Sequence, residues 1–345
     1  MSDIEIRNVY KIFGPEADRH IAAVKAGLTK AELNDRHNHV LGLHDINLTI
    51  PQGKITVVMG LSGSGKSTLI RHINGLIRPT SGEVLYDGRD VVTMSPPELR
   101  AFRREKTAMV FQKFALLPHR TVLQNTVYGL DIRGLPRAEA ERRARHWIER
   151  VGLSGYEDYY PRQLSGGMQQ RVGLARALSN DAEILLMDEA FSALDPLIRV
   201  DMQSILLELQ KELEKTIIFI THDLDEALRL GDKIAVLRDG AIQQVGSGQE
   251  IVLRPATPYI ADFVREVNRG RILQARTIAQ PTEGGGALPA MVVPAHMPLD
   301  QVARRMTRQG AAFAQVQDRA GTHLGVIDLP AILEAMVNPA DAEPA

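Results

Sequence analysis

The sequence contains no cysteine among its 345 residues. This absence excludes disulfide bonds, thiol nucleophiles and metal sites held by cysteine. The chain also lacks an excess of either charge, because 41 basic residues are matched by 42 acidic ones and the formal net charge is −1. Such a balance gives no electrostatic reason to expect nucleic acid as the main partner.

Long apolar stretches are missing as well. No run approaches the roughly 18 residues that a membrane-spanning helix needs, and the polar start MSDIEIRNVYK has no apolar signal core. We therefore expect a cytoplasmic protein, which can still dock onto partners in a membrane. The hydrophobic share of 44% suffices for a large core and a smaller second domain.

Short apolar runs predict the strands of the core. These runs are KITVVMG (54–60), TAMVF (107–111), EILLMD (183–188) and TIIFIT (216–221). They are nearly continuous in apolar residues, as in strands buried on both faces, and the helical patterns between them predict an α/β fold with a parallel sheet. Asp-Gly turns in EVLYDGRDV and IAVLRDGAIQQV predict hairpins, and therefore some antiparallel sheet.

Composition divides the chain further. The polar, alanine-rich segment 15–40 predicts an inserted helical segment, with a capping box from Thr29 to Glu32. A helical subdomain is expected over about 119–180. The stretch AQPTEGGGALP (279–289) is typical of a flexible linker and residues 337–345 of a disordered tail. We thus expect a first domain over 1–278 and a small unit over 290–336.

The stretch GLSGSGKST (60–68) is expected to bind the phosphates of a nucleotide. Its glycines let backbone N–H groups surround phosphates, Lys66 can neutralise the outer ones, and the Ser67 hydroxyl suits Mg²⁺. A glycine-rich turn that matches by chance is the alternative, but a strand precedes the stretch and a helix follows it. The predicted nucleotide-binding residues are Gly60, Ser62, Gly63, Ser64, Gly65, Lys66, Ser67 and Thr68.

Polar residues also follow the buried strands. Asp188 and Glu189 end one strand, where adjacent acids are unfavourable unless a cation or a catalytic task uses them. Asp188 suits Mg²⁺ held through water, and Glu189 suits a general base; a helix N-cap pair is the alternative. Gln112 and His222 end two other strands and are weak signals singly. All lie at carboxyl ends of strands, where open α/β sheets bind ligands.

A second stretch, LSGGMQQR (164–171), predicts a helix start directed at an anion. Ser165 is a good N-cap, and Gly166 and Gly167 leave the backbone bare. This stretch has no lysine, unlike the loop at 60–68.

These motifs resemble, in order and spacing, the ATP-binding subunits of ABC transporters. The resemblance extends from residue 1 to about 270 and rests on GLSGSGKST, FQ, LSGGMQQR, ILLMDEA, SALD and ITHD. It implies a P-loop ABC ATPase domain, with a RecA-like core, an antiparallel β subdomain and a helical subdomain. The implied cofactors are ATP and Mg²⁺.

The resemblance also implies a role for each matched residue. Lys66, Ser67 and Thr68 would hold phosphates and Mg²⁺, and an early aromatic, Phe13 or its rival Tyr10, would stack on adenine. Gln112 would reach the metal and the attacking water, and Asp188 would support Mg²⁺ through water. Glu189 would be the catalytic base, and His222 would contact the γ-phosphate. Asp195 would line a dimer interface, where Ser165, Gly166 and Gly167 would serve the ATP of a partner chain.

A finer resemblance concerns the importers of glycine betaine, proline betaine and choline. It rests on YKIFGPEADRHIAAVKAGLTKAEL, FQKFALLPHRTVLQN and MDEAFSALDPLIR, and on Met168, where most ABC ATPases have glutamine. It implies a homodimer on two integral membrane permease subunits, with a separate substrate-binding protein, at the cytoplasmic face of the inner membrane, and no nucleic acid.

Several alternatives remain at this point. They are an importer ATPase for methionine or polyamine, a non-transport ABC ATPase acting on DNA or ribosomes, and a P-loop kinase, which would not explain the 164–171 stretch or His222. Residues 290–336 resemble one copy of a CBS motif, which related betaine transporters carry in pairs. GVIDLPAIL lacks the hydroxyl that usually contacts a nucleotide there, so a regulatory unit and a structural cap both remain open.

Overall fold

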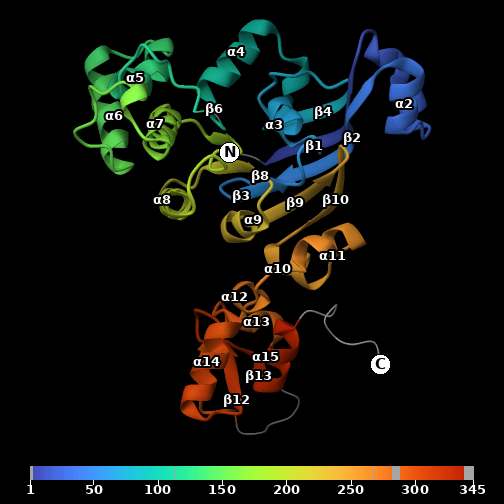
Figure 1. The fold of residues 1–345 in the computed structure, drawn as a ribbon, viewed down its shortest axis with the longest axis vertical. Helices are drawn as coiled ribbons and strands as arrows, with labels where there is room; N and C mark the ends of the chain where they lie inside the picture. Colours follow the sequence, from blue (N-terminus) through green and yellow to red (C-terminus); the bar gives the residue numbers. More distant parts are fainter. Residues whose placement is uncertain (1–2, 113, 266, 282–287, 338–345) are drawn as a thin grey trace. The chain divides into compact units, whose positions relative to one another are not determined.

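The computed structural model describes residues 3–112, 114–265, 267–281 and 288–337. The contacts divide the chain into two compact units, Met1–Val245 and Gly246–Ala345 (Figure 1). They group residues 246–278 with the second unit, whereas the sequence predicted a first domain that continued to 278. Most of the expected linker and the expected tail, at 282–287 and 338–345, lie outside the described residues.

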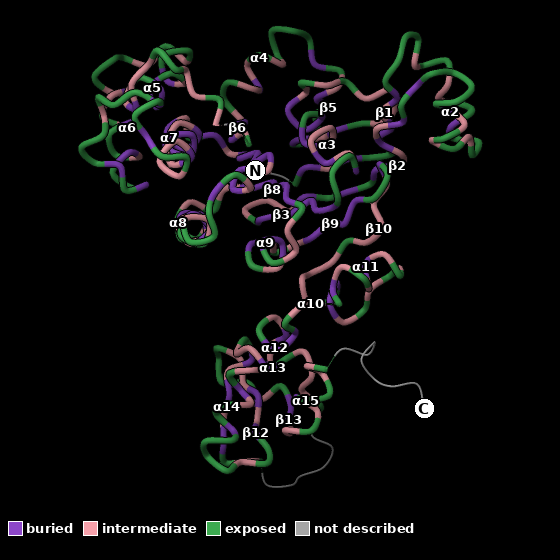
Figure 2. The backbone as a smooth tube through the Cα atoms, viewed as in Figure 1, coloured by how far each residue is buried: buried purple, intermediate pink, exposed green. Residues whose placement is uncertain are grey.

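A six-stranded sheet forms the centre of the first unit, in the order β10-β9-β3-β8-β7-β6. Its strands are β3 (Ile55–Met59), β6 (Thr107–Phe111), β7 (Ile184–Asp188), β8 (Thr216–Thr221), β9 (Lys233–Arg238) and β10 (Ala241–Gly246). Every residue of β3, β7 and β8 is buried (Figure 2). The pairs β6–β7, β7–β8, β3–β8 and β3–β9 are parallel, which confirms the α/β core expected from the apolar runs.

A second, antiparallel sheet has the order β2-β1-β4-β5. Its strands are β1 (Ile4–Phe13), β2 (Val40–Ile50), β4 (Ser81–Tyr86) and β5 (Arg89–Asp90). Helix α3 (Lys66–Ile73) contributes Leu69, Ile70 and Ile73 to the core that joins both sheets. Burying each such side chain contributes about 1.5–3 kcal/mol, so this packing holds the start of α3 firmly between the sheets.

Helices supply the other connections of the first unit. They are η2 (Val91–Thr93), α4 (Pro96–Glu105), α5 (Val122–Ile132), α6 (Arg137–Arg150), η3 (Pro161–Gln163), α7 (Gly166–Ser179), α8 (Pro196–Leu213) and α9 (Leu224–Leu230). Helices α5, α6 and α7 pack against one another (Figure 1). The region expected to be helical from its charge pattern is therefore helical.

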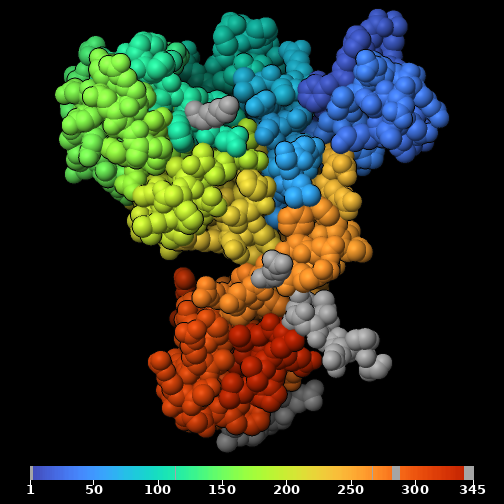
Figure 3. Space-filling model, in the orientation of Figure 1, coloured from blue at the N-terminus to red at the C-terminus, as the bar shows by residue number. Residues whose placement is uncertain are grey.

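The segment between β1 and β2 is the insertion that the sequence predicted to be helical. It contains η1 (Ala17–His20), α1 (Ile21–Lys25) and α2 (Lys30–His37), and it lies at the surface of the first unit (Figure 3). The capping box between Thr29 and Glu32 is present. Val24 and Leu33 pack with Ile12 of β1 and Leu41 of β2, so the insertion has a small core of its own.

The second unit carries a three-stranded sheet of order β11-β12-β13. Its elements are α10 (Gly248–Leu253), α11 (Pro258–Val264), α12 (Arg269–Ile272), α13 (Ala275–Ile278), β11 (Val292–Pro294), α14 (Leu299–Gln309), β12 (Phe313–Gln317), β13 (His323–Asp328) and α15 (Leu329–Met336). Strands β11 and β12 are parallel, and β12 and β13 are antiparallel. Within the described ranges, no helix of either unit has the length and apolar character required to span a bilayer.

Candidate functional site

The loop between β3 and α3 is built around Lys66. The Lys66 side chain is 4% exposed, and its Nζ donates to the carbonyl oxygens of Gly60 at 2.8 Å and of Leu61 at 3.0 Å. Gly60 has φ +155°, and a Cβ there would lie 2.1 Å from the Leu237 carbonyl oxygen. Gly65, with φ +104°, is the N-cap of α3. The loop therefore curls over a buried ammonium at a helix N-terminus, the arrangement that binds phosphate.

The other residues predicted to bind phosphate belong to the same loop at 60–68. Ser64 is buried, and its Oγ has no hydrogen-bond partner in the described chain. Gly63, with φ +79°, has open space where a Cβ would stand. Ser62 is exposed and Thr68 is half-buried. A buried hydroxyl without a partner is unfavourable in the free chain, and a phosphate oxygen would satisfy it.

Asp188 lies next to the end of this loop. It is 7% exposed, and its Oδ1 accepts a hydrogen bond from Ser67 Oγ at 2.8 Å. Its Oδ2 lies 3.8 Å from Nη2 of Arg71 on α3. The Ser67 hydroxyl oxygen and the Asp188 carboxylate thus lie together, and oxygen atoms are the ligands that Mg²⁺ prefers.

Glu189 lies where the strand ends converge. Its Oε1 is 3.5 Å from Lys66 Nζ, and its Oε2 is 3.3 Å from Gln112 Nε2 and 3.5 Å from His222 Nδ1. Its backbone has φ +47°, which strains a residue with a side chain and is found mainly where the surrounding structure enforces it. The structure therefore brings together Lys66, Gln112, Glu189 and His222, as their positions after parallel strands predicted.

Ser192 is a residue of this cluster that the sequence reasoning missed. Its Oγ accepts from Gln112 Nε2 at 3.2 Å and donates to the Glu189 carbonyl oxygen at 2.9 Å. It thereby holds both the strained backbone of Glu189 and the amide of Gln112. The signal that could have found it is a hydroxyl residue three positions after the acid pair.

The 164–171 stretch opens α7, as predicted. Ser165 is the N-cap, and its Oγ accepts from the Met168 N–H at 3.3 Å. Ser165 and Gly166 are exposed, and no hydrogen bond or ion pair among the described residues joins them to Lys66. Gly167 lies against α8, because a Cβ there would come within 2.7 Å of Cγ2 of Ile198.

Asp195 begins α8. Its Oδ1 accepts from the Ile198 N–H at 3.1 Å, so it caps the helix. The next residue along, after Pro196, is Leu197, which is 73% exposed. The carboxylate therefore has a local structural task, beside an apolar side chain that is open to solvent.

The two aromatic residues considered for adenine stacking differ in access. Tyr10 is 8% exposed and makes an edge contact with the His44 ring at 5.4 Å, and burial raises the pKa of its hydroxyl. Phe13 is 40% exposed, and its ring lies over Gly42, where a Cβ would meet it at 2.6 Å. The Gly42 carbonyl in turn lies 2.8 Å from where a Cβ of Gly65 would stand. Phe13 is thus the accessible ring near the phosphate loop.

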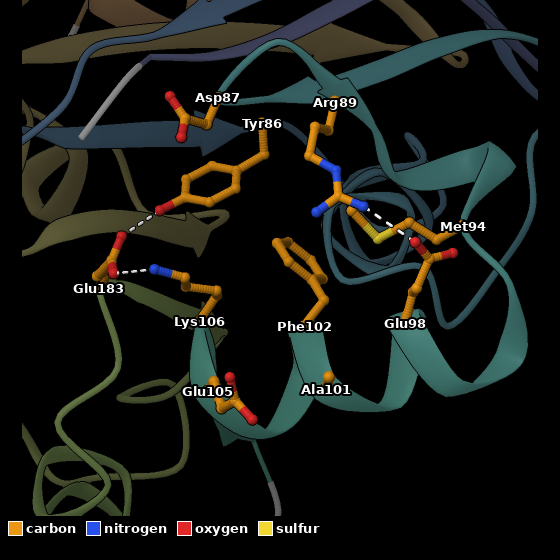
Figure 4. A pocket seen from close by; sticks show the side chains of 10 residues that line it. All are labelled: Tyr86, Asp87, Arg89, Met94, Glu98, Ala101, Phe102, Glu105, Lys106 and Glu183. Atoms are coloured by element: carbon orange, nitrogen blue, oxygen red, sulfur yellow. Dashed lines mark hydrogen bonds and ion pairs between the residues drawn. The ribbon is translucent and has the colours of Figure 1, made fainter.

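A separate cavity of about 370 Å³ lies between the β4–β5 turn and α4 (Figure 4). At one end Glu183 accepts from the Tyr86 hydroxyl and from Lys106, and at the other Arg89 pairs with Glu98 at 3.0 Å. Burial opposes ionisation of Glu183, but Lys106 and Tyr86 outweigh it, so the pKa of Glu183 is lowered. Lys106 and Glu183 precede β6 and β7. The cavity therefore lies at the amino ends of these strands, away from the phosphate loop.

The fold and the cluster together define a class of protein. A buried parallel sheet has a glycine-rich loop with a lysine after one strand and an acid pair after another, and a glutamine and a histidine complete the cluster. This is the arrangement of a P-loop nucleoside triphosphatase.

Comparisons with known proteins identify the family. A family pattern described as "ABC transporter" matches residues 43–192. The glycine betaine transport ATP-binding protein OpuAA of Bacillus subtilis is 51% identical over 280 residues, which cover 81% of this chain and 67% of that protein. The trimethylamine N-oxide transport system ATP-binding protein TmoW of Ruegeria pomeroyi is 42% identical over 334 residues, 97% of each chain.

A solved structure agrees with these matches. The dimeric structure of MJ0796, a bacterial ABC transporter cassette, superposes with a TM-score of 0.61 at 33% identity and covers 71% of this chain and 98% of its own. This chain therefore belongs to the ATP-binding proteins of ABC transporters, which confirms the resemblance seen in its motifs. It is an ATP hydrolase of the ABC type, and ATP is its nucleotide.

Proposed function

We propose that this chain hydrolyses ATP to energise import of a small methylated amine of the glycine betaine class: glycine betaine, proline betaine or choline. The observation that carries the proposal is the 51% identity with a glycine betaine transport protein. That match covers 81% of this chain, more than the 66% that a methionine import protein of Lactiplantibacillus plantarum covers at 45% identity. The longer match favours the betaine class over methionine.

The loop at 60–68 would hold the phosphates. The Lys66 ammonium, now bonded to two carbonyl oxygens, has the charge to hold the outer phosphates. The Ser64 hydroxyl, which has no partner among the described residues, can donate to one of them. Gly60, Ser62, Gly63, Gly65 and Thr68 would complete the loop with backbone and hydroxyl groups. Phe13 would stack on adenine, because its ring is accessible and Tyr10 is not.

Mg²⁺ would be held by Ser67, by Gln112 and, through water, by Asp188. Among the described residues, no group of three or more His, Cys, Asp or Glu could hold a metal. This fits an ion held largely by phosphates with one or two protein ligands. When bound, the ion would supply positive charge beside the phosphate oxygens, and Ser67, Gln112 and Asp188 would fix its position there.

Glu189 would act as the general base and His222 would contact the γ-phosphate. Glu189 is the one carboxylate within 3.5 Å of both Lys66 Nζ and His222 Nδ1 in the described chain. From there it can orient an attacking water and accept its proton. The histidine can donate to a phosphate oxygen on the same side.

Two copies of the chain would share each ATP. Ser165 caps the 14-residue helix that Gly166 and Gly167 begin. Among the described residues no hydrogen bond joins these three to the loop at 60–68, which supports their use on the nucleotide of a partner. Asp195 and the exposed Leu197 would lie at that interface. The structural relative MJ0796 was solved as a dimer, which supports the same assembly here.

The dimer would dock on two integral membrane permease subunits, at the cytoplasmic face of the membrane, and work with a separate substrate-binding protein. A largely apolar cavity of about 510 Å³ between α4 and α5 supports this, with Ala101, Gly129 and the exposed Ile132 among its lining residues. Arg100, Arg103 and Arg104 also line it. A short amphipathic helix of a permease would fit this groove.

Residues 290–336 of the second unit are proposed to be a single CBS-like module. The order β11, α14, β12, β13, α15 supports this assignment. The match to TmoW covers 97% of both chains, so that protein has a counterpart of this unit.

The same match to TmoW favours a second substrate, trimethylamine N-oxide, which like the betaines carries a methylated nitrogen.

Uptake by the assembled transporter tests both candidates. Membrane vesicles that contain the complex would receive labelled glycine betaine, choline or trimethylamine N-oxide, with and without internal ATP. We expect ATP-dependent uptake of at least one of them, and no competition by methionine. Uptake of methionine alone would refute the proposal.

A further inference from the structure

The loop that carries His222 is held on both sides of the histidine. The Asp223 N–H donates to Thr221 Oγ at 3.0 Å, and Asp223 Oδ1 accepts from the Glu226 N–H at 3.1 Å. The imidazole itself remains 55% exposed. The backbone of this loop is therefore fixed, while the ring is left to reach a ligand.

Glu226 lies behind this loop, on α9. It is 4% exposed, and its Oε2 accepts from Thr221 Oγ at 2.5 Å while its Oε1 accepts from Gln203 Nε2 at 3.1 Å. A carboxylate buried so deeply is unfavourable unless donors surround it. Burial raises the pKa of Glu226, against the effect of these two donors. No step of ATP hydrolysis described above uses this group.

Gln203 links Glu226 to helix α8. It is 4% exposed, and its Oε1 accepts from Nη1 of Arg229 at 2.8 Å. Its amide therefore has a fixed orientation, with the oxygen toward the cation and the nitrogen toward the anion. The hydrogen bonds form one chain in which every donor has an acceptor. Arg229 donates to Gln203, Gln203 donates to Glu226, and Thr221 donates to the other carboxylate oxygen of Glu226.

A second link joins α8 to the same loop. Arg199 Nη1 donates to Asp223 Oδ2 at 3.1 Å, and its Nη2 donates to the Leu194 carbonyl at 3.3 Å. Leu194 directly precedes Asp195, the cap of α8. Helix α8 thus contacts the loop of His222 at Asp223 and, through Glu226, at Thr221, and its first turn lies at the proposed dimer interface.

We propose that Glu226 is a positioning residue for His222, and that the chain Arg229–Gln203–Glu226–Thr221 joins α8, α9 and the histidine loop into one body. A displacement of the Asp195 end of α8, when two copies close on ATP, then moves His222 with it. The inference rests on the proposed contact of His222 with the γ-phosphate. It assigns a purpose to a buried carboxylate that lies outside the nucleotide loop.

A swap of two side chains tests the chain of hydrogen bonds. Glu226→Gln alone leaves a mismatch in either orientation of the new amide: its nitrogen faces the amide nitrogen of Gln203, or it faces Thr221 Oγ, whose proton then has no acceptor at 226. Gln203→Glu alone sets two carboxylates against each other. The double variant restores every bond: Arg229 donates to the new carboxylate at 203, the new amide at 226 donates to that carboxylate, and Thr221 donates to the amide oxygen. Total charge is unchanged in the double variant. Glu208→Gln, an exposed site on α8, is the matched control for loss of one carboxylate.

The readouts are kcat and KM for ATP in the complex with its permease subunits, and the thermal unfolding midpoint of each chain. We expect Glu226→Gln to lower kcat about tenfold, with KM within about twofold, since a mismatched buried hydrogen bond is of that order. The same mismatch should lower the unfolding midpoint by a few degrees, so the test of positioning rests on kcat and not on the midpoint. The double variant should return kcat to within about twofold of wild type, and the control should not change it. Thr221→Val should repeat the loss and Thr221→Ser should avoid it.

A further comparison separates positioning from simple stability. In single-turnover measurements on a His222→Ala chain, Glu226→Gln should produce no additional loss, because its effect passes through His222. An equal loss in both backgrounds, or failure of the swap to restore kcat, would overturn the inference alone. A His222→Ala chain with normal turnover would overturn the proposed role of His222 and the inference with it.

Discussion

His72 makes the stability of the first unit depend on pH in a way that can be calculated. It lies on α3, 1% exposed, and its Nδ1 donates to the Thr68 carbonyl at 2.6 Å, while its Nε2 has no partner in the described chain. Burial lowers the pKa of His72 from 6.5 to about 4. The imidazole is therefore neutral in the folded protein over a range in which it is protonated in the unfolded chain.

The sign of the effect follows from this shift. Between about pH 6.5 and about pH 4 the unfolded chain binds the extra proton, so stability is lost as the pH falls through that window. From about pH 7 to about pH 5 the loss attributable to His72 is about 2 kcal/mol. His72→Leu replaces the titrating imidazole with an apolar side chain of similar size that remains buried.

Urea unfolding followed by Trp147 fluorescence measures this effect, because Trp147 is the single tryptophan and lies on α6 of the same unit. We expect the wild-type chain to lose about 2 kcal/mol more than His72→Leu between the two pH values. Equal pH dependence in the two chains would refute the reasoning.

Three further predictions concern the site. Glu189→Gln should retain ATP binding, lose at least about 100-fold in turnover and form a dimer stabilised by ATP; near-normal hydrolysis would remove Glu189 from the role of base. Gly60→Ala should weaken ATP binding more than tenfold, because the added Cβ would lie 2.1 Å from a backbone oxygen. The Cβ added by Gly63→Ala would enter open space, so this variant should bind ATP more tightly than Gly60→Ala. Phe13→Ala should raise the KM for ATP about tenfold through loss of stacking, and Tyr10→Leu, which removes the other ring, should leave it unchanged; the reverse pattern would assign adenine to Tyr10.

The buried strands and the loop could be predicted from the sequence because their physics is local. A strand buried on both faces must be apolar throughout, and each of the four expected runs forms a strand of the parallel sheet. The residues after those strands must meet at one edge, whatever the connections between them. The positions of Gln112, Asp188, Glu189 and His222 followed from this rule.

Other features depend on contacts that the sequence does not display. Ser192 belongs to the cluster only because the chain turns sharply at Glu189, with φ +47°. The second unit begins at residue 246 because α10 packs with α11 and α12, and α12 in turn packs with α14 and α15. No composition change marks that point. Glu226 looks like an ordinary acid on a helix, and only its burial against Gln203 and Thr221 distinguishes it.

A mixture of two inactive chains tests most directly whether each ATP is shared between copies. Lys66→Ala removes the phosphate lysine, and Ser165→Arg blocks the start of α7; each homodimer should be inactive in the assembled transporter. In an equal mixture, half of the dimers pair one chain of each kind, and each such dimer holds one complete site of two. We predict ATP turnover of about a quarter of the wild-type rate. Turnover no higher than that of either variant alone would show that Ser165 serves the ATP of its own chain and would contradict the shared site.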